Sequence, residues 1–201
     1  IPTSPTATNP RASRPMNRPR STSSSTRSGD SAGPSSRFPV EAPPSSLPVT
    51  APPVRLLIAG AGARGSAYAR LAVDTGRAAV VGIAEPRRHL REAIAAELHV
   101  PAEGVFEDWQ AMLRTRLPAD GIIIATPDRD HGRPFAAAAA HGYPVLLEKP
   151  IAPDPAGCAE LARLEQESGI RAAVCHVLRY TPLTTLLRQV LSAGAVGQVI
   201  S

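Results

Sequence analysis

Short apolar runs alternate with amphipathic stretches from residue 54 onward. Residues 54–59, Val-Arg-Leu-Leu-Ile-Ala, are almost continuously apolar and end in glycines, which is typical of a parallel strand covered on both faces. Elsewhere the apolar positions recur at helical spacing, as at Leu90, Ile94 and Leu98. Strands are predicted at residues 54–59, 79–84, 121–125, 145–147 and 171–175, and helices at residues 66–73, 87–98, 107–114, 134–141, 155–167 and 182–192.

The order of these elements predicts the fold class. Strands that alternate with helices in units of about 25 to 30 residues indicate an α/β fold with a Rossmann-type, doubly wound parallel sheet. A strand-like run at residues 196–201 follows the last helix and stops at the end of the chain. It resembles the beginning of another unit that has been cut off.

The first quarter of the chain has a different composition. Residues 1–53 hold 12 of the 22 prolines, together with long runs of serine and threonine. Such a segment cannot bury enough apolar surface to offset the entropy of ordering it. We therefore expect residues 1–53 to be a disordered tail.

The charge and the cysteine content limit the classes of binding partner that we expect for this chain. The net charge is +5, but six arginines against Asp30 and Glu41 in the tail leave only +1 from residue 54 onward, which argues against a nucleic-acid partner. No apolar run is long enough for a membrane span or an export signal. Cys158 and Cys175 have no metal-ligand spacing. We expect a cytoplasmic protein without a metal, membrane or nucleic-acid partner.

A glycine-rich turn follows the first predicted strand. In Gly60-Ala61-Gly62-Ala63-Arg64-Gly65, the first glycine permits a tight turn, the second lets the backbone approach a pyrophosphate, and the third allows close helix packing. The amino-terminal amides of the following helix would face the anion. Because a strand precedes this turn and a helix follows it, the turn predicts a dinucleotide site.

Glu85 ends the second predicted strand, 20 residues beyond Gly65, where a carboxylate can accept hydrogen bonds from the adenosine ribose. Its charge would repel a 2′-phosphate and so favours NAD over NADP. Arg87 and Arg88 leave NADP possible, because a guanidinium there could hold that phosphate, although a role as solvated residues of a first helical turn is favoured for both. NAD is the predicted cofactor.

Lys149 is the single lysine in a chain with 21 arginines. An ammonium group can exchange protons near neutral pH when buried, which a guanidinium cannot do, so this lysine is a candidate for chemistry. It follows the predicted strand at residues 145–147 and so lies at the carboxyl edge of the sheet, where ligands bind in such folds.

The preceding predicted strand ends in a second candidate loop, Thr126-Pro127-Asp128 followed by His131. The proline ends the strand and turns the chain across the crevice, and Asp128 is a candidate cap for the next helix. His131 could be a ligand or simply a histidine at the start of a helix. The glycine turn, this loop and Lys149 should share one rim.

Together these segments resemble the Gfo/Idh/MocA family of nicotinamide-dependent oxidoreductases, from about residue 55 to residue 201. The segments that carry the resemblance are the glycine turn, Glu85-Pro86, Thr126-Pro127-Asp128 with His131, Glu148-Lys149-Pro150, and His176-Val177-Leu178-Arg179-Tyr180 with Pro182. The Glu-Lys-Pro triplet is the most specific of them.

The resemblance implies an NAD(P)-binding Rossmann domain over residues 54–176 and, over residues 177–201, the incomplete start of an α/β substrate domain that is largely missing. Family enzymes transfer hydride between a nicotinamide cofactor and a hydroxyl of a sugar, inositol or similar polyol. The missing domain would supply a catalytic histidine and often an oligomer interface, so the full-length protein is expected to be a homo-oligomer. We expect this chain to bind dinucleotide with little or no turnover.

The resemblance also assigns roles to residues. Lys149 would hydrogen-bond the reacting hydroxyl as the catalytic group. His176 and Arg179 are weaker substrate candidates that could instead be a strand-end pair linking two domains. The residues expected to bind the cofactor are Gly60, Gly62, Ala63, Arg64, Gly65, Glu85, Thr126, Pro127, His131 and Glu148.

Two other functions remain open. An NAD-dependent glycosidase of the same superfamily would oxidise a sugar transiently, eliminate a group, add water and reduce the product again. A catalytically idle dinucleotide-binding module would bind nucleotide and turn nothing over. Net release of NADH would argue against the glycosidase cycle, and retained nucleotide binding without turnover in the full-length product would support the idle module.

Overall fold

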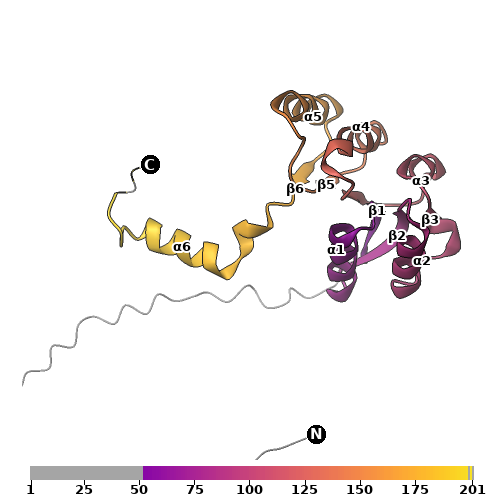
Figure 1. Cartoon of the computed structure of the whole chain (residues 1–201), viewed down its shortest axis with the longest axis horizontal. Coiled ribbons are helices and arrows are strands. Elements are labelled where there is room, and N and C mark those ends of the chain that lie inside the picture. Colours follow the sequence, from indigo (N-terminus) through magenta and orange to yellow (C-terminus); the bar gives the residue numbers. More distant parts are fainter. Residues whose placement is uncertain (1–51, 199, 201) are drawn as a thin grey trace, which may run out of the picture. The chain divides into compact units, whose positions relative to one another are not determined.

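A six-stranded parallel sheet lies at the centre of the protein, in the order β3-β2-β1-β4-β5-β6. The computed structural model describes residues 52–198 and residue 200 (Figure 1). The predicted disordered tail therefore lies outside the described residues, except for its last two positions. The strands are β1 (Val54–Ala59), β2 (Ala78–Ala84), β3 (Val105–Phe106), β4 (Gly121–Ile124), β5 (Val145–Leu147) and β6 (Ala172–Val174).

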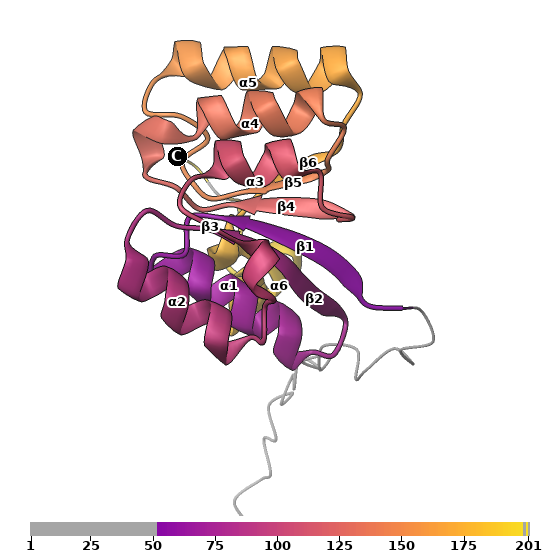
Figure 2. The same ribbon diagram turned by 90° about the vertical axis from the view of Figure 1, so that its right-hand side faces the viewer.

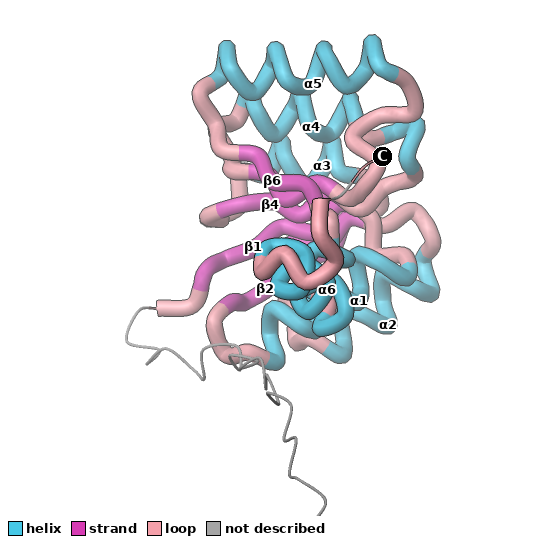
Figure 3. The backbone as a smooth tube through the Cα atoms, turned by 90° about the vertical axis from the view of Figure 1, so that its left-hand side faces the viewer, coloured by secondary structure: helices cyan, strands magenta, loops and turns pink. Residues whose placement is uncertain are grey.

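Helices cover the two faces of this sheet in separate groups (Figures 2 and 3). Helices α1 and α2 lie on one face, and α3, α4 and α5 lie on the other. The predicted α/β class and doubly wound topology are therefore confirmed. The helices are α1 (Ala63–Asp74), α2 (Arg88–Glu97), α3 (Trp109–Thr115), α4 (Gly132–Ala140), α5 (Pro155–Ser168) and α6 (Pro182–Ser192).

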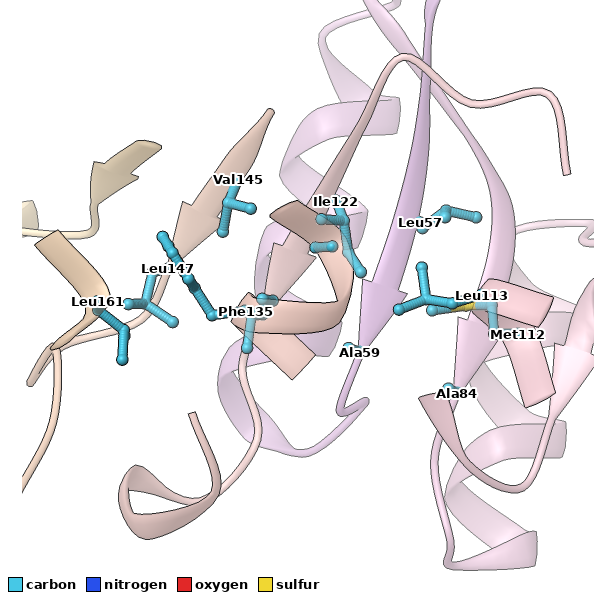
Figure 4. Close-up of a cluster of buried hydrophobic side chains, with 12 residues drawn as sticks. Leu57, Ala59, Ala84, Met112, Leu113, Ile122, Phe135, Val145, Leu147 and Leu161 are labelled. Carbon is cyan, nitrogen blue, oxygen red and sulfur yellow. The ribbon is translucent and has the colours of Figure 1, made fainter. Parts of the chain in front are cut away.

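Two apolar clusters, one on each face, explain why the strands are almost wholly apolar. On one face, side chains of β1, β4 and β5 pack against Met112 of α3, Phe135 of α4 and Leu161 of α5 (Figure 4). On the other face, Ile58 and Ile123 pack with Ile94 of α2. Because successive side chains of a strand point to opposite faces, both sets of positions must be apolar.

The structure contains one strand that the sequence pattern did not predict. Strand β3 has two residues, Val105 and Phe106, which pair with Ile83 and Ala84 of β2. Two residues are too few to display an alternation of apolar and polar side chains. At the other end of the chain, the predicted strand-like run begins with turn and bend residues at 196–198, and residues 199 and 201 lie outside the described part.

Local signals set most helix ends close to their predicted positions. Asp108 caps α3 by accepting a hydrogen bond from the amide of Ala111, and Asp154 caps α5 through the amide of Gly157. Gly169 ends α5 in the left-handed conformation, with φ +69°. Asp128 does not cap α4, because a short 3-10 turn, η2 (Asp128–Asp130), intervenes before that helix begins.

An ion pair ties the beginnings of β1 and β4 together. The Arg55 guanidinium and backbone amide donate three hydrogen bonds to the Asp120 carboxylate, at 2.7 to 3.0 Å. The side-chain hydrogen bond from Arg55 and then its backbone hydrogen bond lower the pKa of Asp120 from 3.8 to about 2.

This pKa shift predicts a contribution to stability that depends on pH. Because the folded-state pKa is depressed, the pair stabilises the fold above pH 3.8, and this contribution is lost as the pH falls toward about 2. Urea unfolding at a series of acidic pH values should show that Asp120→Asn removes this part of the pH dependence. Arg55→Gln should remove most of it, because it removes the side-chain hydrogen bond and the charge of Arg55 but leaves the backbone hydrogen bond. An unchanged pH dependence in both variants would contradict the prediction.

Candidate functional site

The glycine-rich turn at residues 60–65 joins β1 to α1 and lies against the backbone that follows β4. Gly60 has φ +90°, and a Cβ atom on it would lie 2.6 Å from the carbonyl oxygen of Ala125. A Cβ atom on Gly65 would lie only 1.8 Å from the carbonyl oxygen of Gly60. Both distances are far below van der Waals contact, so these two positions require glycine.

The amino-terminal end of α1 leaves its first amides free for an anion. Gly62 is the N-cap residue, and among the described residues no side chain caps this end. The first turn begins with Ala63 and Arg64 and carries no acidic residue. The positive end of the helix dipole is therefore not neutralised by a side chain of the helix itself.

Glu85 lies directly after β2 and is buried, with 3% of its surface exposed. Its carboxylate accepts a hydrogen bond from the Ala61 amide at 2.9 Å, which ties the acidic residue to the glycine turn. Three more hydrogen bonds come from Arg87, through its backbone amide, Nε and Nη2, at 3.1, 2.6 and 3.2 Å. These four donors fill the hydrogen-bonding capacity of a carboxylate.

The same contacts keep Glu85 ionised. Burial alone would raise the pKa of Glu85, but the hydrogen bonds and charge of Arg87, with the Ala61 amide, outweigh burial and hold the pKa below its ordinary value.

Of the two arginines considered for a 2′-phosphate, Arg88 instead pairs with Glu92 on the surface of α2. Arg87 is engaged with Glu85.

A cleft of about 600 Å³ opens at the carboxyl edge of the sheet and is lined by residues that follow β1, β2, β3 and β4. It includes the position between β1 and β4, where the strand order reverses and where ligands bind in doubly wound folds. Gly60, Gly62 and Glu85 line one part of the cleft, and Thr126 and Pro127 line another. The structure thus brings together two of the three predicted loops.

His131 is fully buried and joins two loops rather than lining this cleft. Its Nδ1 lies 2.8 Å from the carbonyl oxygen of Pro150, and its Nε2 lies 3.0 Å from the carbonyl oxygen of Thr126. Each ring nitrogen therefore lies within hydrogen-bond distance of a backbone carbonyl oxygen, and the nitrogen that carries the proton donates to it. The ring connects the loop after β4 to the loop after β5, which carries Lys149.

Glu148 and Lys149 follow β5 and differ sharply in exposure. Glu148 is 5% exposed, and its carboxylate accepts hydrogen bonds from the Tyr68 hydroxyl at 2.6 Å and from the Lys149 amide. Arg64 Nε lies 3.7 Å from the same carboxylate, so the glycine turn and this loop are linked. Lys149 itself is exposed, whereas its suggested role in proton exchange assumed a buried ammonium group. The Lys149–Pro150 peptide bond is cis.

His176 and Arg179 lie after β6, at the 3-10 turn η3 (Val177–Tyr180). Both residues are exposed, and neither lines the cleft. The amide of Arg179 donates to the carbonyl oxygen of His176 at 3.0 Å, a contact that closes the turn. Their assignment to a substrate stays a prediction.

Two groups of residues at the site were not identified from the sequence. Asp108, Trp109 and Gln110 line the cleft because they follow β3, the short strand that the pattern did not show. Trp109 is the only tryptophan in the chain, which is a signal that could have drawn attention to it. Tyr68 in α1 meets Glu148 from 80 residues away, and no local pattern records such a contact.

Within the described residues, no helix has the length and apolar character needed to cross a membrane.

Comparison with known proteins places the chain among oxidoreductases. The profile of the Gfo/Idh/MocA oxidoreductase family, described as an NAD-binding Rossmann fold, matches residues 54–176, more than half of the chain. Inositol 2-dehydrogenase 1 of Saccharopolyspora erythraea is 29% identical over 149 residues, which are 73% of this chain and 44% of that protein. The 2,7-anhydro-N-acetylneuraminate hydratase of Mediterraneibacter gnavus is 29% identical over 143 residues, 71% of this chain and 37% of the relative.

Solved structures share the fold over the same portion. Myo-inositol 2-dehydrogenase from Lactobacillus plantarum superposes with a TM-score of 0.68 at 24% identity, over 74% of this chain and 43% of that one. Scyllo-inositol dehydrogenase from Lactobacillus casei, solved with bound NAD(H) and scyllo-inositol, gives a TM-score of 0.67 at 21% identity, over 73% and 43%. The chain therefore spans less than half the length of these proteins.

Proposed function

Because the chain belongs to the Gfo/Idh/MocA family of oxidoreductases and contains its NAD-binding Rossmann fold, we propose that it is the cofactor-binding portion of a dehydrogenase acting on a polyol. The reaction would transfer hydride between NAD and a hydroxyl of a sugar, inositol or similar polyol. The single observation that carries the proposal is the Glu148-Lys149-Pro150 loop, held beside the glycine turn by Arg64 and Tyr68. Relatives named inositol 2-dehydrogenase support the substrate class.

The residues of the cleft fit a dinucleotide. The open amino-terminal end of α1 offers backbone amides to a pyrophosphate, and the glycines at 60 and 62 leave space for it. Glu85 stands where a ribose would bind, but Arg87 occupies its carboxylate, so ribose hydroxyls would have to replace at least one hydrogen bond from Arg87. Bound NAD would supply a hydride acceptor at its nicotinamide ring.

Lys149 would act on the substrate in this scheme. As an ammonium, its exposed side chain would donate a hydrogen bond to the oxygen of a substrate hydroxyl. As a neutral amine, it would accept the hydroxyl proton while the carbon loses hydride, and so become an ammonium. Glu148 would hold the backbone of Lys149, because its carboxylate accepts a hydrogen bond from the Lys149 amide. Thr126 and Pro127 line the cleft on the side of β4, where the nicotinamide half would lie.

The direct test is NADH formation. An enzyme that includes this chain, incubated with NAD⁺ and a panel of inositols, sugars and sugar acids, should produce NADH stoichiometrically with one class of polyol. Isothermal titration of NAD⁺ into the chain alone should show binding whether or not turnover occurs. Absence of both binding and NADH formation would overturn the proposal.

A second candidate function is suggested by the relatives named as hydratases. In a redox-neutral cycle, hydride taken from the substrate returns to the product after an elimination or a hydration, so no NADH accumulates. Product analysis separates the two candidates. Consumption of a sugar derivative with catalytic amounts of NAD⁺ and no net NADH would favour the redox-neutral cycle.

Glu85→Gln should weaken the binding of NAD⁺ by about tenfold, because an amide replaces a charged acceptor for the ribose hydroxyls. Isothermal titration with NAD⁺ measures this effect. Glu92→Gln is the matched control, since Glu92 also pairs with an arginine but lies on the exposed face of α2. Equal affinities for the Glu85→Gln variant and the unmodified chain would place the ribose elsewhere.

Cellular location and assembly are also part of the proposal. The free cysteines Cys158 and Cys175 are compatible with a reducing cytoplasm. Homo-oligomerisation through a second domain stays a prediction for the longer protein.

A further inference from the structure

Tyr68 lies in the second turn of α1, the helix that begins at the glycine turn, and points to the loop after β5. Its hydroxyl donates a hydrogen bond of 2.6 Å to Glu148 Oε1, which is a short bond to a charged acceptor. Glu148 Oε2 in turn accepts the backbone amide of Lys149. A chain of two hydrogen bonds therefore runs from α1 to the backbone of the lysine.

The surroundings of this contact make it stronger than a surface hydrogen bond. Glu148 is 5% exposed, and Cys175, which lies directly after β6, is 7% exposed. Burial first, and then the hydrogen bond to Glu148, raise the pKa of Tyr68, so the hydroxyl keeps its proton and remains a donor. Arg64 is the cation near Glu148, at 3.7 Å, and its side chain is 63% exposed. The buried carboxylate therefore depends on Tyr68 for a close side-chain donor.

Without the Tyr68 hydroxyl, the nearest remaining side-chain donor to Glu148 Oε1 is Arg64, whose Nε lies 3.7 Å away. A buried carboxylate that loses a donor must find another partner or turn toward water, and either movement would shift the group that holds the Lys149 amide. Lys149 has an exposed side chain, so its position depends on its backbone more than on packing.

We propose that Tyr68 is a positioning residue, which holds Glu148 and through it sets the position of Lys149 relative to the glycine turn. The inference rests on the proposed function for its meaning, since Lys149 is the group assigned to the substrate. The geometric link itself can be tested without cofactor or turnover.

The single lysine of the chain makes the test specific. Reductive methylation with ¹³C-formaldehyde labels Lys149 and the terminal amine, so one side-chain signal reports on Lys149. In the cofactor-free chain, Tyr68→Phe should displace this signal from its position in the unmodified protein. Tyr143→Phe is the matched control, because that tyrosine hydroxyl also donates a hydrogen bond, to the Leu117 carbonyl oxygen at 3.2 Å, away from this loop.

Glu148→Gln changes the acceptor of the Tyr68 hydrogen bond, and it provides the test if the Tyr68→Phe variant does not fold. This variant should also displace the Lys149 signal, and the double variant should show less than the sum of the two displacements. A Lys149 signal that is unchanged in the folded Tyr68 and Glu148 variants, or displaced equally by Tyr143→Phe, would overturn the inference.

Titration of NAD⁺ into the labelled chain that carries no substitution separates the inference from the proposed function. If NAD⁺ does not bind, the proposed function fails. The displacement of the Lys149 signal by Tyr68→Phe is measured without NAD⁺, so it tests the link from Tyr68 to Lys149 whether or not NAD⁺ binds.

Discussion

Gly65→Ala is expected to abolish measurable NAD⁺ binding and to lower the free energy of unfolding by about 3 kcal/mol or more. A Cβ atom at this position would lie 1.8 Å from the carbonyl oxygen of Gly60, a backbone atom that cannot move alone. The turn and the first amides of α1 must therefore shift. Because those amides are the groups proposed to bind the pyrophosphate, stability and binding should be lost together.

Isothermal titration with NAD⁺ and urea unfolding measure the two effects of Gly65→Ala. Gly132→Ala is the matched control, because a Cβ atom at Gly132, the first residue of α4, would lie 3.7 Å from Leu161 Cδ1, which is an ordinary contact. This control should keep both stability and affinity. Unchanged NAD⁺ affinity in the Gly65 variant would mean that the turn is not the pyrophosphate site.

Lys149→Ala, in an enzyme that includes this chain and turns over, is expected to lower kcat by about 100-fold to 10,000-fold, the usual worth of a group that manages a proton in the transition state. The Kd for NAD⁺ should change by less than about threefold, which corresponds to less than about 1.4 kcal/mol of binding free energy. The reason is that Lys149 is exposed and does not line the cleft assigned to the cofactor.

Lys149→Arg sharpens this test. The variant keeps the positive charge, but a guanidinium does not exchange its proton near neutral pH, so kcat should remain low. Recovery of activity by arginine would show that charge alone is needed. Parallel loss of NAD⁺ affinity and kcat in the alanine variant would assign Lys149 a structural role.

Much of the fold follows from local patterns. The bounds of β1, β5 and α6 match the predicted ranges because each is a single apolar run or a helix with clear ends. Asp154, Pro155 and Gly169 delimit α5 by chemistry that is local to the chain. Strand β3 was missed because its two residues are a strand only by virtue of their hydrogen bonds to β2.

The site was only partly predictable. Gly60 and Glu85 were identified because the spacing of a phosphate turn and its acidic partner is recorded in the sequence, and both line the cleft. Trp109 was missed together with the strand that precedes it. The assignment of His131 to the cofactor stays a prediction, and the burial of its ring between two backbone carbonyl oxygens was not indicated by its neighbouring residues.

The sequence by itself determined the α/β class, the doubly wound parallel sheet and the glycine turn, because the period of apolar residues and the steric needs of glycine act over a few residues. Only the tertiary structure decided that Arg87 fills the Glu85 carboxylate, that Tyr68 holds Glu148, and that Lys149 is exposed. Those outcomes depend on which side chains meet after the sheet has assembled. Burial then determines whether each polar group must find a partner, and that information is not local to any segment of the chain.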